Sequence, residues 1–114
     1  MEDKNIYKGI SIAWYEREKI NGLKKKGLFS LTLDDVADIM EDQYFKCYYS
    51  SQNLVYPRTS MTLINEGRLT LINSSVGYAR DNVRFVSKTV NVMKQDMSET
   101  EFISLCKTIG NKKY

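Results

Sequence analysis

The chain begins with a helical pattern of apolar positions. From Ile6 onward, apolar side chains recur at intervals that place them on one side of an α-helix, as far as Ile20. We expect this first helix to end at residues 21–22 or at the lysine run 24–26 before Gly27. Lysines at a helix C-terminus complement the helix dipole, so a solvated helix end is one interpretation of this run and phosphate contact is the other.

Two further helices are indicated by capping residues that precede an apolar stripe. Thr32, with Asp35 three residues later, predicts a helix that ends near Gln43. Ser98 and Glu101 form a full capping box and predict the last helix. The apolar stripe of the second helix is Leu33, Val36, Ala37 and Met40, and that of the last helix is Phe102, Leu105, Cys106 and Ile109. The last helix should end at Gly110. We expect Cys106 to be a buried hydrophobe.

The second helix also carries acidic residues that resemble a metal site in composition. These side chains circle the outside of one helix and do not converge on a point: Asp34, Asp35, Asp38, Glu41 and Asp42. We interpret them as a solvated face.

Between residues 68 and 96 the pattern changes from that of strands to helical spacing. We expect a strand that starts at Arg68, a turn at residues 77–78, a return strand at 83–86 and a helix that starts near Ser87. A hairpin followed by a helix is therefore the predicted centre of an α+β fold.

Two other segments are expected to be extended. The tetrapeptide TLIN occurs at 62–65 and again at 70–73, and its simplest interpretation is a hairpin with a turn at 66–68. Residues 44–50 are aromatic and β-prone. The tyrosines of this region fill the core and its rim in one interpretation and stack on nucleic-acid bases in the other.

The composition limits the number of domains and the classes of function. A chain of 114 residues with 42% hydrophobic content suits one domain, 1–114, with frayed ends at 1–5 and 111–114. The 17 Lys and Arg against 14 Asp and Glu give a net charge of +3, which permits nucleic-acid binding without requiring it. No apolar run approaches the ~20 residues needed to cross a bilayer.

The two cysteines, Cys47 and Cys106, lack the spacing of a metal site, and the chain contains no histidine. This excludes a zinc site built from Cys and His. We expect reduced thiols, a cytoplasmic location, no membrane association and no cofactor.

Six segments in a fixed order carry a resemblance to a known family. They are LTLDD at 31–35, CYYSS at 47–51, LTLIN at 69–73, GYARDNV at 77–83, VNVMK at 90–94 and SETEFISLCKTI at 98–109. Together they resemble the small phage-type HNH endonucleases of the ββα-metal group, over most of the chain from Ile6 onward. The resemblance implies an HNH-like ββα core, a β-hairpin plus a helix, with two N-terminal helices and a C-terminal helix.

Three residues match functional positions of that family. The resemblance implies that Asn82 orders the turn between the two strands. It also implies that Asn91 and Lys94 lie on the side of the helix that faces metal and phosphate.

Three other positions depart from the family, and the departures remove its chemistry. Thr70 and Asn73 stand where the family has acids, and Leu71 stands where it has a general base or its substitute. Mg²⁺ prefers anionic oxygen ligands, and activation of water needs a base or a strongly polarising ion. Asp81 is the one acid near this region of the sequence, and it neighbours Asn82. We therefore expect no bound metal and no catalytic residue.

What remains is a basic surface, for which the resemblance suggests double-stranded DNA as partner. The candidate phosphate ligands are Lys24, Lys25, Lys26, Arg58, Arg68, Arg80, Arg84, Lys88 and Lys94. Ordinary solvated charges are the alternative interpretation. The expected function is that of a catalytically inactive, HNH-like DNA-binding module.

Two other functions remain open. A phage-encoded protein of this kind could inhibit a host DNA-processing or defence protein, with Tyr48, Tyr49 and Tyr56 as candidate anchors, since tyrosine is enriched at binding hot spots. An active metal-dependent endonuclease with rearranged ligands is the third hypothesis. The sequence does not indicate the oligomeric state.

Overall fold

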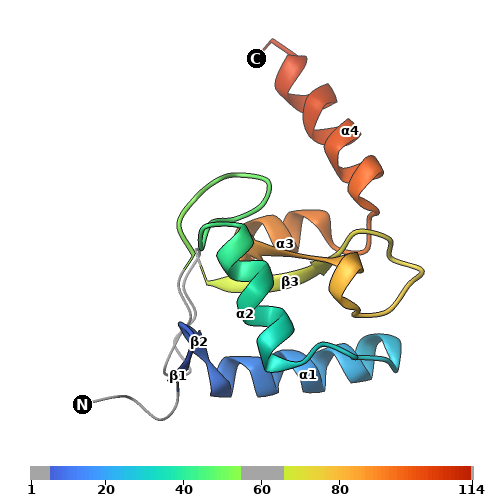
Figure 1. The fold of residues 1–114 in the computed structure, drawn as a ribbon. Coiled ribbons are helices and arrows are strands. Elements are labelled where there is room, and N and C mark those ends of the chain that lie inside the picture. The colour runs from blue at the N-terminus through green and yellow to red at the C-terminus, as the bar shows by residue number, and fades with distance from the viewer. Residues whose placement is uncertain (1–5, 55–65, 114) are drawn as a thin grey trace.

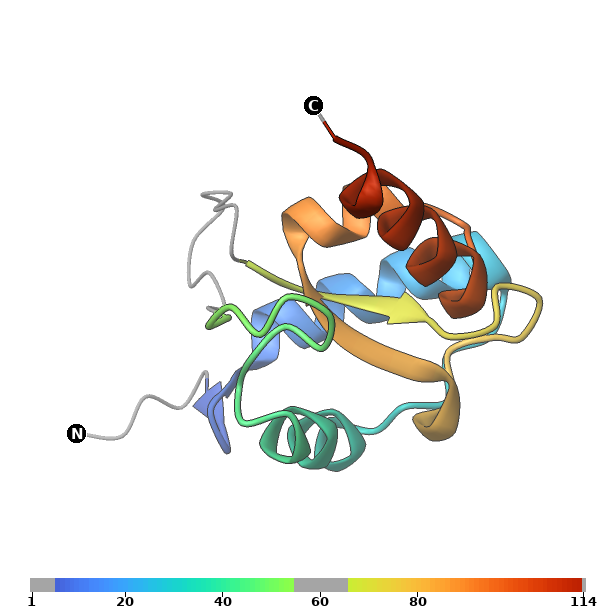
Figure 2. The same cartoon turned by 90° about the horizontal axis from the view of Figure 1, so that it is seen from above.

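Two antiparallel strands and the helix that follows them form the centre of a mixed α+β fold (Figure 1). The structure is a computed structural model that describes residues 6–54 and 66–113. Its elements are β1 (Ile6–Tyr7), β2 (Ile10–Ser11), α1 (Ile12–Lys26), α2 (Leu33–Asp42), β3 (Gly67–Leu71), the 3-10 helix η1 (Arg80–Asn82), β4 (Val83–Ser87), α3 (Lys88–Lys94) and α4 (Glu99–Asn111). Viewed from above, the strands run between α2 on one side and α3 and α4 on the other (Figure 2).

The central hairpin confirms the two strands and the helix expected between residues 68 and 96, whereas its turn lies at residues 74–75 and not at 77–78, where Tyr78 pairs with Phe29. β3 pairs with β4 from Gly67 opposite Ser87 to Leu71 opposite Val83. Ser87 then caps α3 by accepting a hydrogen bond from the amide of Val90 at 3.2 Å. The change from strand to helix thus occurs where the sequence predicted it.

The prediction of a turn at residues 66–68 is wrong. Gly67 and Arg68 lie inside β3, because their backbones pair with Ser87 and Val86 of β4. The first copy of the repeated tetrapeptide, at 62–65, lies outside the described residues. A local repeat suggested pairing with a neighbour in sequence, whereas the second copy pairs with a strand that follows it.

A core of aromatic and aliphatic side chains joins α1 and α2 to the hairpin. The ring of Trp14 on α1 stacks on Phe85 of β4, with 5.2 Å between centroids. Its indole nitrogen donates to the carbonyl of Gly67 at 2.6 Å, so one side chain fixes α1 to both strands. Val36 and Met40 of α2 are fully buried in the same core.

The first helix starts six residues later than expected. Residues 6–11 form the small β1–β2 hairpin, and Lys8 and Gly9 at its turn have φ of 48° and 82°. Ser11 then caps α1 by accepting a hydrogen bond from the amide of Trp14. The apolar spacing from Ile6 fits a helix, but the left-handed turn and the cap override it. The later of the two expected ends is confirmed, since Gly27 is the left-handed C-cap.

Residues 44–54 form a loop in which the described backbone has one isolated bridge, between Lys46 and Asn53, instead of the extended segment expected at 44–50. Tyr44 and Phe45 both have positive φ, which ends α2 and reverses the chain. The side-chain amide of Gln43 holds the reversed segment on β4. It donates to the Phe85 carbonyl and accepts from the Phe85 N–H, both at 2.9 Å.

The last helix is confirmed at its start and differs from expectation at its end. Ser98 and Glu101 form the capping box, and the Glu99 amide donates to the Ile72 carbonyl at 2.9 Å. The helix continues through Gly110 to Asn111, so Gly110 is not its C-cap. Beyond its first turns α4 extends away from the body of the molecule (Figure 1). Cys106 is consequently half-buried, not buried.

In the part of the chain that the structure describes, no helix has both the length and the apolar character needed to cross a membrane.

Candidate functional site

Asn82 organises the turn that connects β3 to β4. Its side-chain nitrogen lies 3.0–3.1 Å from the carbonyl oxygens of Asn73, Val76 and Gly77. Its side-chain oxygen accepts a hydrogen bond from the Asn73 amide at 2.9 Å. One buried amide therefore satisfies backbone groups that the eleven-residue connection 72–82 would otherwise leave unpaired. This is the role that the resemblance implied for Asn82.

Asn73 is part of the same turn and not of the cavity beside it. Its side-chain oxygen accepts hydrogen bonds from both the amide and the hydroxyl of Ser75, at 3.0 and 2.6 Å. The structure therefore does not bring Asn73 together with Thr70, although the resemblance assigned both to one metal site.

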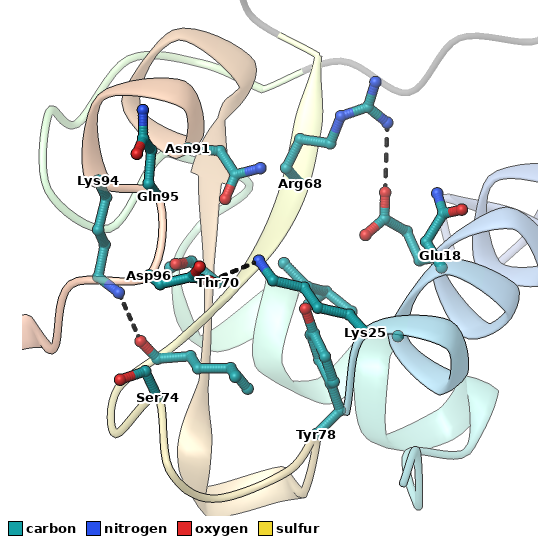
Figure 3. Close-up of a pocket in the computed structure, with 14 residues that line it drawn as sticks. Glu18, Lys25, Arg68, Thr70, Ser74, Tyr78, Asn91, Lys94, Gln95 and Asp96 are labelled. Atoms are coloured by element: carbon teal, nitrogen blue, oxygen red, sulfur yellow. Dashed lines mark hydrogen bonds and ion pairs between the residues drawn. The ribbon is translucent and has the colours of Figure 1, made fainter. Parts of the chain in front are cut away.

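A polar cavity of about 280 Å³ lies where α1, β3 and α3 meet (Figure 3). One water occupies roughly 30 Å³ of the liquid, so the cavity admits a group much larger than water. Thr70 and Asn91, two of the positions singled out in the sequence, line it, as does Leu71. The charged side chains around it are Glu18, Lys25, Arg68, Lys94 and Asp96.

The ammonium group of Lys94 is turned onto the backbone. Its nitrogen donates to the carbonyls of Leu71 and Met97, both at 2.6 Å, and the residue is 1% exposed. Burial lowers the pKa of Lys94, because the charged form loses its hydration. Lys94 thus contributes positive potential to the wall of the cavity and holds the end of α3 on β3.

Arg68 is held between two buried carboxylates. Its guanidinium lies 2.8 Å from Glu66. The same group lies 3.2 Å from Glu18 of α1 (Figure 3). Burial raises the pKa of Glu18, and the charge of Arg68 opposes that shift. Of the two acids that line the cavity, Glu18 is therefore paired with an arginine. Among the described residues, no three Asp, Glu, Cys or His side chains are grouped so that they could hold a metal ion.

Two of the three lysines at the end of α1 face the cavity and its adjoining turn. The Lys25 ammonium lies 3.0 Å from the carboxylate of Asp96, and both side chains are largely exposed. Lys26 donates to the carbonyl of Ser74 at 2.6 Å. Lys24 is exposed at the same helix end. Lys26 thus contacts the β3–β4 turn and Lys25 the segment after α3, which the sequence alone did not indicate.

Arg80 lies on another side of the molecule, against α2. One of its guanidinium nitrogens is 3.2 Å from Asp35 and 3.2 Å from Asp38. The two carboxylates raise the pKa of Arg80. The acidic face of α2 therefore has a structural partner, and Arg80 does not belong to the cavity.

Arg84 and the tyrosines of the 44–54 loop meet at the start of α4. Arg84 lies 4.0 Å above the ring of Tyr48 and 3.3 Å from the carboxylate of Glu99. Tyr49 donates its hydroxyl to Glu99 at 2.8 Å and packs against Phe102. Burial and the neighbouring carboxylate raise the pKa of Tyr49. This cluster fixes α4 to the body, at a site separate from the cavity.

The remaining candidates are not brought to the cavity. Lys88 is half-buried at the start of α3 and does not line it. Arg58 and Tyr56 lie outside the described residues.

The sequence did not identify Glu18 or Asp96 as neighbours of the cavity, nor Glu66 as a partner of Arg68. A signal for Glu18 was present, because it follows Trp14 by four residues and precedes Gly22 by four, on the buried side of α1. No comparable local signal marks Asp96.

Comparison of the chain with protein-family models, curated proteins and solved structures found no match. Function is therefore argued from the arrangement of the side chains.

Proposed function

We propose that the protein is a catalytically inactive, HNH-like module that binds double-stranded DNA, with a backbone phosphate at the mouth of the cavity. The order of strand, Asn-centred turn, strand and helix supports an HNH-like ββα core. The observation that carries the proposal is the cavity itself, in which Lys25 and Lys94 lie beside Thr70 and Asn91, two positions that the resemblance associates with metal and phosphate. Its two carboxylates, Glu18 and Asp96, are each paired with a cation.

The lining of the cavity argues against hydrolysis. Thr70 offers a neutral hydroxyl and Leu71 offers no side-chain base, whereas Mg²⁺ prefers carboxylate oxygens. The nearby carboxylate of Glu18 is occupied by Arg68. Losing a general base alone typically lowers a rate about 10²–10⁴-fold. We expect no nicking of supercoiled plasmid in Mg²⁺ or Mn²⁺, and nicking that Asn91→Ala abolishes would restore the hypothesis of an active enzyme.

The same lining suits a phosphate. Lys25 is paired with an exposed carboxylate, and such surface pairs contribute only about 0–1 kcal/mol, so a phosphate can replace Asp96. The amide of Asn91 and the buried ammonium group of Lys94 favour the same anion. Arg68, in contrast, is already paired with Glu18 and Glu66. Arg80 and Arg84 are paired within the protein, so we expect few phosphate contacts and modest affinity.

The test is duplex binding, followed by fluorescence anisotropy over a range of salt concentrations. Lys25→Ala should weaken binding several-fold for all sequences and lower the salt slope by about 1. Lys107→Ala is the matched control, because Lys107 is an exposed lysine on α4 away from the cavity. Equal affinities of the Lys25 and Lys107 variants would contradict phosphate binding at the cavity.

A second function, inhibition of a host protein by direct binding, is favoured by exposed aromatic residues in the 44–54 loop. Tyr44 is 82% exposed and Tyr48 is 47% exposed. Tyr49, in contrast, is engaged with Glu99. Tyr44→Ala should abolish recovery of a stoichiometric partner from a nuclease-treated bacterial lysate, while leaving DNA binding unchanged. Recovery that survives this change would remove the support for this function.

A further inference from the structure

The apolar stripe of α4 continues past the point where the helix leaves the body of the molecule. Phe102 is buried and Cys106 is half-buried against the core. Leu105 is 45% exposed and Ile109 is 49% exposed, although both belong to the same stripe. Successive residues of an α-helix are about 100° apart, so these four side chains share an arc of about 100°. Half of a continuous hydrophobic face is therefore open to solvent.

The charges of α4 are separated along its length. Its first turn contains Glu99 and Glu101, whereas Lys107, Lys112 and Lys113 lie in its second half or just beyond its end. The negative side chains complement the positive N-terminal end of the helix dipole and the lysines complement its negative end. Two such helices side by side attract each other when antiparallel, and repel each other when parallel, because parallel pairing brings like charges together.

We propose that α4 packs antiparallel against α4 of a second copy of the chain, over the exposed half of the stripe, Leu105 and Ile109. The middle of this exposed half lies at the level of Lys107, so the twofold axis passes there. The pairing sets Leu105 of each copy beside Ile109 of the other and buries both. Removal of these side chains from water drives the association, and the oppositely charged ends of α4 favour the antiparallel orientation of the two helices.

The register follows from the positions on the helix. Glu101 and Lys112 are eleven residues apart, which is about three full turns, so they lie on the same flank of the stripe. An antiparallel pair centred at the level of Lys107 brings Glu101 of one copy to within one residue of the level of Lys112 of the other. Within the stripe, the two Cys106 side chains lie closest to the level of the axis.

The first experiment is the molar mass of the full chain as a function of concentration, by light scattering after size exclusion. We expect a reversible shift from the 13.2 kDa monomer to twice that mass. Ile109→Glu should keep the protein monomeric. Ile103→Glu is the matched control, because Ile103 is also exposed on α4 but lies about 100° from Phe102 around the helix. Unchanged circular dichroism of dilute samples establishes that both variants fold.

The second experiment tests the register by cross-linking with a short bismaleimide, which adds one thiol to each end and needs no oxidant. Cys106 should give a covalent dimer that Cys106→Ser abolishes, whereas Cys47 is buried and should not react. Glu101→Gln preserves a capping box and removes the charge, so it should weaken association several-fold and reduce its salt dependence. A protein that stays monomeric, or a dimer that survives Ile109→Glu or fails to cross-link at Cys106, would overturn the proposal.

This pairing goes beyond DNA binding and uses no residue of the cavity. DNA is absent from both experiments, so either proposal can fail without the other.

Discussion

α2 and α4 begin with the same local signals and end in different surroundings. Each starts with a capping box, and each carries four apolar side chains at helical spacing. In α2, Val36, Ala37 and Met40 are all buried. In α4, Phe102 is the one residue of the stripe that is buried.

The difference follows from what holds each helix. α2 is attached along its length, by Arg80 at Asp35 and Asp38 and by Gln43 on β4. α4 is attached near its start, where Glu99 meets Tyr49 and Ile72. An amphipathic sequence shows that a helix has a face to bury, but it does not show whether the partner lies in the same chain.

The largest expected effect is the difference in stability loss when one apolar side chain is truncated in the α2 stripe and one in the α4 stripe. Met40→Ala should lower the free energy of unfolding by about 2–5 kcal/mol, because it leaves a cavity in a closed core. Leu105→Ala should lower it by less than about 1 kcal/mol, since half of that side chain is already in water. Urea unfolding at concentrations where the chain is monomeric measures both. Equal losses would mean that the α4 stripe belongs to the core.

A smaller effect is expected from the caps. Thr32→Ala and Ser98→Ala each remove a side-chain acceptor of the first turn, worth about 1 kcal/mol to its helix. For α2 this loss should appear in global stability, because the helix is part of the core. For α4 it should appear as faster hydrogen exchange of α4 amides, with a smaller change in the unfolding midpoint. The comparison fails if both variants shift the midpoint equally.

The smallest expected effect is the dependence on pH. Hydrogen bonds to Thr32 lower the pKa of Asp35, and hydrogen bonds to Ser98 lower the pKa of Glu101. A folded-state pKa below the unfolded value, which is about 4 for both types, gives stability that is present above pH ~4 and lost as pH falls through the folded pKa. Asp35→Asn should flatten the fall of the urea midpoint between about pH 5 and 3, whereas Glu101→Gln should change it less. A larger effect for Glu101 would contradict the assignment of α2 to the core.

Elements whose signals are local could be predicted from the sequence. The starts of α2, α3 and α4 depend on Thr32, Ser87 and Ser98, each of which bonds to an amide three residues away. The predicted start of α1 was wrong because the left-handed turn at Lys8 and Gly9 and the Ser11 cap override the apolar spacing. The turn predicted at 66–68 was wrong because distant partners hold these residues in a strand. Gly67, for example, is held in a strand by Ser87 and by Trp14.

The candidate site was only partly predictable for the same reason. The order of motifs led to Thr70 and Asn91, which do line the cavity. It did not reveal that Glu18 pairs with Arg68, since fifty residues separate them. It also could not show that Asn73 is turned into its own loop.

The sequence alone determined where three helices begin, because their caps are hydrogen bonds between residues close in the chain, which the residue types largely dictate. The role of Asn82 in the turn between two strands was implied by the resemblance. Tertiary structure decided which cations line the cavity and which apolar stripe is covered. Charge pairing and burial depend on neighbours brought together in space. Arg80 is therefore paired with Asp35 of α2, whereas Lys25 lines the cavity.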